Sequence, residues 1–253
     1  MHADMNRNIK IAVAVVAVLL ATAAGVYAYY LVGTPTKAPS QAVTPPPSNE
    51  AQKAPPEAMP EPSENVPDAV SATGTESVYY IDATTSTATF TLNEDLRGVR
   101  TTVVGTTSNV SGEFALDREN IEAARIGTIR INARTFKTDS EQRNRAIVRM
   151  IFRSEDDANE FIEFKPTKVT VNASSTANGE FFPFTVTGDL SISGATRPAI
   201  FEGKGQFVSD TEFQGSVETM VRYADYGLSV PQLPFLANVE EVVKLRLDFV
   251  AKQ

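Results

Sequence analysis

The sequence contains no cysteine and no tryptophan, and its one histidine is His2, close to the N-terminus. Without cysteine the protein cannot form disulfides, thiolate metal sites or a cysteine nucleophile. Histidine is the usual general base near neutral pH and a common ligand of transition metals. Because the residues after His2 contain neither type, Ser-His-Asp catalysis, Cys-His catalysis and ordinary zinc sites are excluded. We therefore expect no enzyme, no cofactor and no metal.

Positive charge is also in deficit. The chain has 253 residues, with 23 Lys and Arg against 31 Asp and Glu, which gives a net charge of −8. A protein that binds nucleic acid needs a basic surface to neutralise phosphates. The charge balance therefore argues against a nucleic-acid partner.

Charge is entirely missing from residues 11–31, a run of 21 apolar and small residues. As a helix this run would span about 32 Å, close to the thickness of the hydrocarbon core of a bilayer. Arg7 and Lys10 precede it, and the positive-inside rule then places the N-terminus in the cytoplasm. We predict a cytoplasmic tail at 1–10 and a transmembrane signal anchor at 11–32, with the remainder periplasmic or extracellular. A cleavable signal peptide is the alternative, although its apolar region is normally only about 7–15 residues long.

Residues 33–75 hold ten of the fifteen prolines and few apolar side chains. Such a segment cannot bury enough surface to offset the entropy of ordering, and proline keeps it extended. We predict a disordered linker at 33–75. A spacer that lifts the following domain away from the membrane is a hypothesis for its purpose.

From residue 76 the dominant period is two, which is typical of β-strands with one apolar and one polar face. Val243, Leu245, Leu247 and Phe249, for example, alternate with charged residues. We predict that residues 76–253 form an all-β domain, an extended eight-stranded antiparallel barrel. The runs that predict strands are 78–92, 100–107, 109–117, 125–137, 160–172, 181–193, 197–208 and 212–223, with a last one at 239–251.

One stretch breaks this period and predicts a helix at about 141–152. Ser140 is a favourable N-cap, and an acidic residue follows it in the first turn. Ala146, Ile147, Met150 and Ile151 recur at helical spacing and should face the barrel. The acidic run at 155–157 lacks the alternating spacing of a calcium loop, and a polar turn is the better interpretation.

Several segments resemble motifs of one family. VTGDLSISGATRP at 186–198 is similar to the VTGDLTIHGVTKP signature of the YceI-like family. The sequences YID at 80–82, SGEFALD at 111–117, EQR at 141–143 and DYGL at 225–228 resemble further motifs of that family, in the same order. The first match is fairly specific, and together the matches cover about residues 78–251.

The resemblance implies a lipocalin-like barrel without catalysis, which carries a lipid or polyisoprenoid in an elongated interior outside the cytoplasm. Parity alone leaves a filled core and a ligand cavity equally open, and the resemblance favours the cavity. The residues with inward parity that would bind the ligand are Phe90, Ile131, Phe164, Phe182, Phe184, Phe201, Val217, Leu245 and Leu247. Arg143, Arg145 and Arg149 could bind an anionic headgroup, or they could simply form a solvated helix face.

Three functions remain to be weighed. A tethered carrier predicts a hydrophobic ligand in the barrel, whereas an adhesion or assembly module predicts a filled barrel and a protein partner. An enzyme that uses only carboxylates ranks last, because no pair of acidic residues stands out by its spacing. The sequence leaves a homodimer open, although no run marks an exposed strand edge.

Overall fold

The computed structural model describes residues 35–40, 76–173 and 176–253. The predicted cytoplasmic tail at 1–10, the predicted membrane segment at 11–32 and most of the predicted linker lie outside these ranges. No helix within them is long and apolar enough to cross a membrane.

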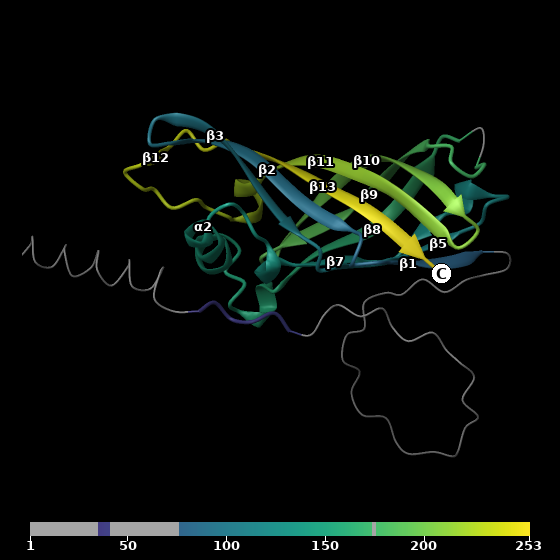
Figure 1. Cartoon of the computed structure of the whole chain (residues 1–253), viewed down its shortest axis with the longest axis horizontal. Coiled ribbons are helices and arrows are strands. Elements are labelled where there is room, and N and C mark those ends of the chain that lie inside the picture. Colours follow the sequence, from purple (N-terminus) through teal and green to yellow (C-terminus); the bar gives the residue numbers. More distant parts are fainter. Residues whose placement is uncertain (1–34, 41–75, 174–175) are drawn as a thin grey trace, which may run out of the picture.

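The described residues form a single curled antiparallel sheet (Figure 1). Its strands are β1 (Ser77–Ile81), β2 (Thr87–Leu96), β3 (Val99–Thr107), β4 (Val110–Ser111), β5 (Glu113–Leu116), β6 (Arg125–Ile126), β7 (Ile129–Asn132), β8 (Phe161–Val171), β9 (Phe182–Ile192), β10 (Ala195–Ser209), β11 (Glu212–Arg222), β12 (Leu236–Ala237) and β13 (Val242–Lys252). The period-two pattern thus correctly predicted an all-β domain.

The number of strands was wrong: eight were expected, and the sheet has thirteen. Several of the long runs predicted as single strands are divided into two strands, because a side chain or a glycine interrupts the backbone hydrogen bonds between neighbouring strands. The first run separates into β1 and β2 at residues 82–86, where the Val250 N–H donates to the Ser86 hydroxyl at 3.0 Å. Gly112 separates β4 from β5, and residues 127–128 separate β6 from β7. The predicted strand at 125–137 ends at Asn132, because its side chain caps a short 3-10 turn, η2 (Ala133–Thr135).

The sheet closes on itself. Its hydrogen-bonded path runs β4-β7-β8-β9-β10-β11-β13-β1-β5-β6, and β4 continues through Gly112 directly into β5. The Gly112 carbonyl accepts a hydrogen bond from the Ile81 N–H at 2.9 Å, and the Glu113 carbonyl accepts one from the Gly127 N–H at 2.9 Å. Both ends of the path therefore meet in one stretch of chain, and the strands enclose a barrel.

The predicted helix is present at one end of the barrel. It consists of α2 (Glu141–Ala146) followed by one π-helical turn, η3 (Ile147–Ile151). Ser140 caps it as expected, because its hydroxyl accepts the Arg143 N–H at 3.3 Å. The other short turns are η1 (Ile121–Ala123), η4 (Asp157–Asn159) and η5 (Tyr223–Tyr226). Figure 1 shows α2, β12 and the tip of β3 together at the same end.

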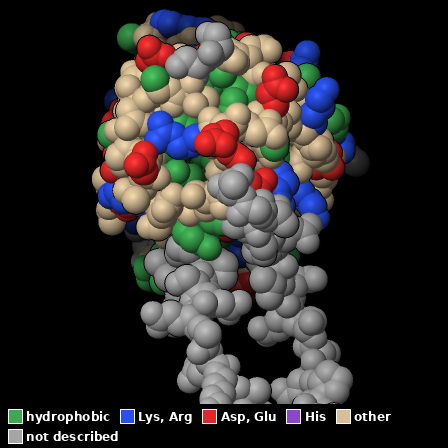
Figure 2. Space-filling model, turned by 90° about the vertical axis from the view of Figure 1, so that its right-hand side faces the viewer, with side chains coloured by type: hydrophobic (Ala, Val, Ile, Leu, Met, Phe, Trp, Pro, Cys, Tyr) green, Lys and Arg blue, Asp and Glu red, His purple; other side chains and the backbone are tan. Residues whose placement is uncertain are grey.

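Aromatic side chains fill the opposite end of the barrel. Phe213 lies at their centre, with its ring centroid 5.1 Å from Phe207, 5.7 Å from Phe114 and 6.5 Å from Tyr79. All four side chains are buried. In Figure 2, which faces this end, charged and hydrophobic side chains are scattered over the surface and no hollow is visible outside the grey region. We refer to this as the closed end, and to the end near α2 as the open end.

Candidate functional site

The interior between the two ends is hollow. A cavity of about 1040 Å³ extends from the aromatic cluster of the closed end to the loops of the open end. Drug-sized ligands usually occupy pockets of roughly 300–1000 Å³, so this cavity is large. It reaches the surface at the open end, because its wall includes Val99 and Phe235, which are 65% and 50% exposed.

Eight of the nine residues predicted to face a ligand line this cavity. They are Phe90, Ile131, Phe164, Phe184, Phe201, Val217, Leu245 and Leu247. The sheet register explains why they converge, since inward residues of neighbouring strands lie opposite one another. Leu247 is opposite Val217 on one side and Ala88 on the other, and Leu245 is opposite Phe90. The wall is therefore built from continuous apolar rows across several strands.

Phe182 is the exception. Its ring lies 6.1 Å from Phe213 and 6.2 Å from Phe207, within the aromatic cluster of the closed end. The filled core and the cavity, which parity could not separate, thus both occur in one barrel. The closed end is filled and the rest is hollow, so the filled interior expected of an adhesion module is not what the structure shows.

Helical and loop residues complete the cavity wall at the open end. Ile147, Met150 and Ile151 contribute from η3. Such π-helical turns are rare and occur frequently at functional sites. Tyr226 and Leu228 contribute from the other side. Burial raises the pKa of the Tyr226 phenol above its usual value, so this side chain is neutral at neutral pH.

The charged residues that line the cavity are Glu94, Arg97, Asp139, Arg143 and Arg246, and Glu94 and Arg143 form an ion pair. Glu94, on β2, is only 6% exposed, and its Oε1 accepts a hydrogen bond from Arg143 at 3.0 Å. Arg143 also pairs with Asp139. The guanidinium is therefore shared by two carboxylates. Glu94 has the same parity as the inward residues Phe90 and Leu92, and this is the signal in the sequence that identifies it.

The structure separates the three arginines predicted to bind a headgroup. Arg143 lines the cavity, whereas Arg145 and Arg149 do not. The Arg149 side chain is 3% exposed, and its Nε donates to Glu155 at 3.0 Å. Of these three arginines, Arg143 therefore lies at the cavity, whereas Arg149 is paired with Glu155 away from it.

The family model of the YceI-like domain matches residues 79–251. The chain belongs to the YceI-like family. A UPF0312 protein of Shewanella sp. (strain MR-4) is 27% identical over 143 residues, which are 54% of this chain and 70% of the relative. A UPF0312 protein of Shewanella sp. (strain ANA-3) is 28% identical over 145 residues, with the same coverage.

Two solved structures share the fold of this YceI-like domain. One is the crystal structure of Burkholderia cenocepacia BcnA, with a TM-score of 0.53 and 13% identity over 68% of this chain and 99% of that one. The other is a polyisoprenoid binding domain from Saccharophagus degradans implicated in plant cell wall breakdown, with a TM-score of 0.53 and 19% identity over 69% of this chain and 97% of that one. At these identities the likeness shows the fold alone.

The YceI-like motifs have structural roles in shaping the cavity. Gly188 lies where β8 and β9 approach closely, and a Cβ there would meet the Lys165 carbonyl oxygen and lie 2.8 Å from Cζ of Phe164. Glycine therefore allows the Phe164 ring to pack in the wall. Gly194, at φ +80°, forms the tight turn between β9 and β10 together with Ser193. Gly227, at φ +66°, ends η5 and turns Leu228 toward the cavity.

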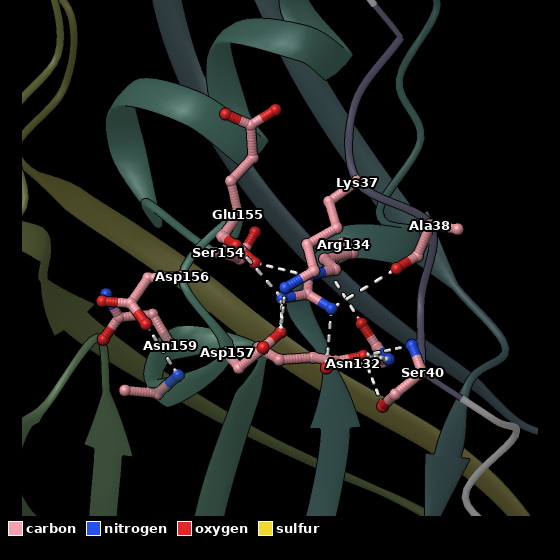
Figure 3. A network of polar contacts seen from close by, with 12 residues as sticks. Lys37, Ala38, Ser40, Asn132, Arg134, Ser154, Glu155, Asp156, Asp157 and Asn159 are labelled. Carbon is pink, nitrogen blue, oxygen red and sulfur yellow. Dashed lines mark hydrogen bonds and ion pairs between the residues drawn. The ribbon is translucent and has the colours of Figure 1, made fainter.

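Sequence reasoning missed a second polar site of this YceI-like domain, on the outside of the barrel (Figure 3). The Arg134 and Glu160 side chains are 1% and 3% exposed and form an ion pair of 2.7 Å. Arg134 also pairs with Asp157 at 2.6 Å, and Asn132 donates to Glu160 at 2.7 Å. We call these four residues the Arg134 network. Arg134 lies in the predicted strand at 125–137, where the period of two would place it on the polar face, but η2 removes it from that strand.

Carboxylates around the Arg134 network are held in their charged form. Burial alone would raise the pKa of Glu160, but hydrogen bonds from Ser40 and Asn132 and the charge of Arg134 lower it below its usual value. Hydrogen bonds from Arg134 and Lys37 lower the pKa of Asp157. The acidic run 155–157 is a polar turn as predicted, and no metal-binding group of acidic residues occurs in the described ranges.

Proposed function

We propose that this protein binds a lipid with a long apolar tail, of the polyisoprenoid class, inside the barrel and without catalysis. The observation that carries the proposal is the apolar cavity of about 1040 Å³ with one closed and one open end. A tail buried there would gain about 0.8 kcal/mol for each methylene removed from water. Membership of the YceI-like family and the shared fold with a polyisoprenoid binding domain support the same ligand class.

The polarity of the cavity gives the bound lipid a direction. Aromatic rings of the closed end offer no polar partner to a headgroup, whereas Glu94 and Arg143 lie near the open end. We therefore place the end of the tail against Phe249 and Phe114 and the headgroup beside Arg143. Because Glu94 and Asp139 already compensate this guanidinium, the site suits an uncharged polar headgroup better than a fully ionised phosphate.

The proposal also includes a location. Residues 11–32 anchor the chain in a membrane, and the barrel lies on the extracytoplasmic side, periplasmic or extracellular. The uncharged run at 11–31 and the basic residues before it support this placement. The anchor keeps the barrel beside the lipid phase from which its ligand comes.

The direct test is to purify the full chain from its membranes, extract it with organic solvent and analyse the extract by mass spectrometry. We expect an isoprenoid or a similar long-chain lipid in a stoichiometric amount. A barrel that is repeatedly empty, and that does not take up a polyprenyl quinone or a polyprenyl alcohol when these are added, would refute the proposal.

A further inference from the structure

Residues 35–40, which we call the strap, lie against the outside of the barrel although they belong to the predicted disordered linker. In Figure 1 the strap is the purple segment that passes below α2, and Figure 3 shows Lys37, Ala38 and Ser40 around Arg134. These six residues form specific contacts with the barrel.

The strap binds to the Arg134 network through main-chain and side-chain groups. The Ser40 N–H and hydroxyl both donate to Oε1 of Glu160, at 2.7 and 2.8 Å. The Ala38 carbonyl accepts a hydrogen bond from Arg134 at 3.3 Å. Lys37 pairs with Asp157 at 2.6 Å. Glu160 and Arg134 are nearly inaccessible to solvent, so the strap helps to cover a charged pair that would otherwise be costly to bury.

The strap also has a defined direction along the barrel. Its first residue, Pro35, accepts a hydrogen bond at its carbonyl from Arg149 at 3.0 Å. Arg149 belongs to η3, the turn from which Ile147, Met150 and Ile151 line the cavity at the open end. The chain therefore reaches the barrel beside the open end and then runs toward the closed end, as the purple segment does in Figure 1.

This attachment changes what the linker can do. Only residues 33 and 34 separate the proposed anchor from Pro35. At roughly 3.3–3.6 Å per residue, a fully extended chain covers about 10 Å from residue 32 to residue 35. Residues 41–75 connect Ser40 to Glu76, and both of these residues lie on the barrel. On this inference the contacts of residues 35–40, and not the length of residues 41–75, set the distance between the proposed anchor and the barrel.

The rim of the open end suits contact with lipid. Val99 and Phe235 are 65% and 50% exposed there, and both continue into the cavity wall. Apolar side chains that protrude beside a large apolar cavity would be solvated poorly in water and well at a bilayer surface.

We infer that the strap, by docking on the Arg134 network, holds the open end of the barrel against the membrane so that lipid passes directly between bilayer and cavity. This inference rests on the proposed anchor at 11–32. The lipid bilayer is the partner of the rim formed by Val99 and Phe235.

The test uses the full chain in liposomes and single cysteine probes, which the absence of natural cysteine makes specific. An environment-sensitive fluorophore is attached to Val99→Cys at the open end or to Thr211→Cys, in the turn between β10 and β11 at the closed end. Lipids that carry a nitroxide quencher on the acyl chain report which probe lies at the bilayer. We expect quenching of the probe at position 99 and none at position 211.

The strap is then released by the double substitution Lys37→Glu and Ser40→Pro. It places a like charge beside Asp157 and removes both donors to Glu160, while the sequence of the barrel stays intact. The matched control is Lys53→Glu with Ser48→Pro, the same changes in residues 41–75. We expect the strap variant to lose the quenching at position 99 and the control to retain it. Circular dichroism of each variant checks that the barrel is folded.

Other outcomes separate the steps of the inference. The parent chain could float with the liposomes and yet show no quenching at position 99. The chain would then be anchored, but the open end of its barrel would not lie at the bilayer. This result would overturn the inference and would leave the proposed anchor standing. Equal quenching in the strap variant and the control shows that the strap does not hold the barrel. A chain that does not float with liposomes refutes the anchor itself, and ligand extraction then still tests the cavity.

Discussion

A polar group placed in the cavity wall should weaken ligand binding far more than it weakens the fold. Val217, on β11, lines the middle of the cavity opposite Leu247. In Val217→Asn the amide can be hydrated while the cavity is empty, but a bound tail leaves it without a partner. An amide buried without hydrogen bonds costs about 1–3 kcal/mol in proteins, which corresponds to a roughly 5–150-fold loss of affinity.

Val242→Asn is the matched control, because Val242 lies on the neighbouring β13 with 44% exposure and opposite parity to the inward row. A chain that begins at Pro35 keeps all described residues and suits titration with dansyl-labelled geranylgeraniol, whose emission rises in an apolar site. We expect parent affinity in the control and the stated loss in Val217→Asn.

Thermal unfolding of both variants tests whether the loss is local. Unchanged affinity in Val217→Asn would show that the tail does not occupy this part of the barrel. An equal loss in both variants without any change in thermal unfolding would show that the loss does not depend on an inward position, and either of these two results would refute the assignment of the cavity as the ligand site.

Three further predictions concern the stability of the barrel. Arg134→Met leaves a buried carboxylate unpaired and should cost about 3–5 kcal/mol in urea unfolding, whereas Arg222→Met, in an exposed pair, should cost less than about 1 kcal/mol; similar losses would contradict the assigned burial. The pKa of Glu160 is lowered in the folded state, so its ionised form stabilises the fold above its usual pKa, and this contribution disappears as the pH falls below about 4.5. Glu160→Gln should therefore reduce the dependence of the unfolding free energy on pH in the acidic range. An unchanged dependence would show that ionised Glu160 does not stabilise the fold. Gly188→Ala should cost about 1–3 kcal/mol through overpacking and lower the midpoint of thermal unfolding, and an unchanged midpoint would mean that the β8–β9 contact can relax.

The period of two was enough to predict the barrel and most of its wall. Inward residues such as Leu245 and Leu247 follow from local alternation, because a strand that is buried on one face must place every second side chain there. The sequence did not predict which part of the barrel is filled. Phe182 packs in a cluster of aromatic rings from β5, β10 and β11, and these strands come together only when the sheet closes into a barrel.

The places where strands break were also beyond local reasoning. Ser86 interrupts the first run because it accepts the N–H of Val250, a residue 164 positions away. Arg134 has the parity of a solvated side chain, yet it is covered by η4, by the turn after η3 and by the strap. Glu94 was within reach, because a carboxylate among inward apolar residues is a visible exception to the pattern.

The aromatic cluster around Phe213 has a consequence for how cargo can be exchanged. The aromatic cluster closes the cavity at one end. A lipid bound in the cavity would therefore have to leave through the same open end by which it entered. Its tail goes in first and its head comes out first, and the depth of the pocket limits how much of a longer tail can be sheltered. If the proposed lipid binds there, uptake and release would both use this one opening. The surface that the opening faces would then matter as much as the affinity of the cavity.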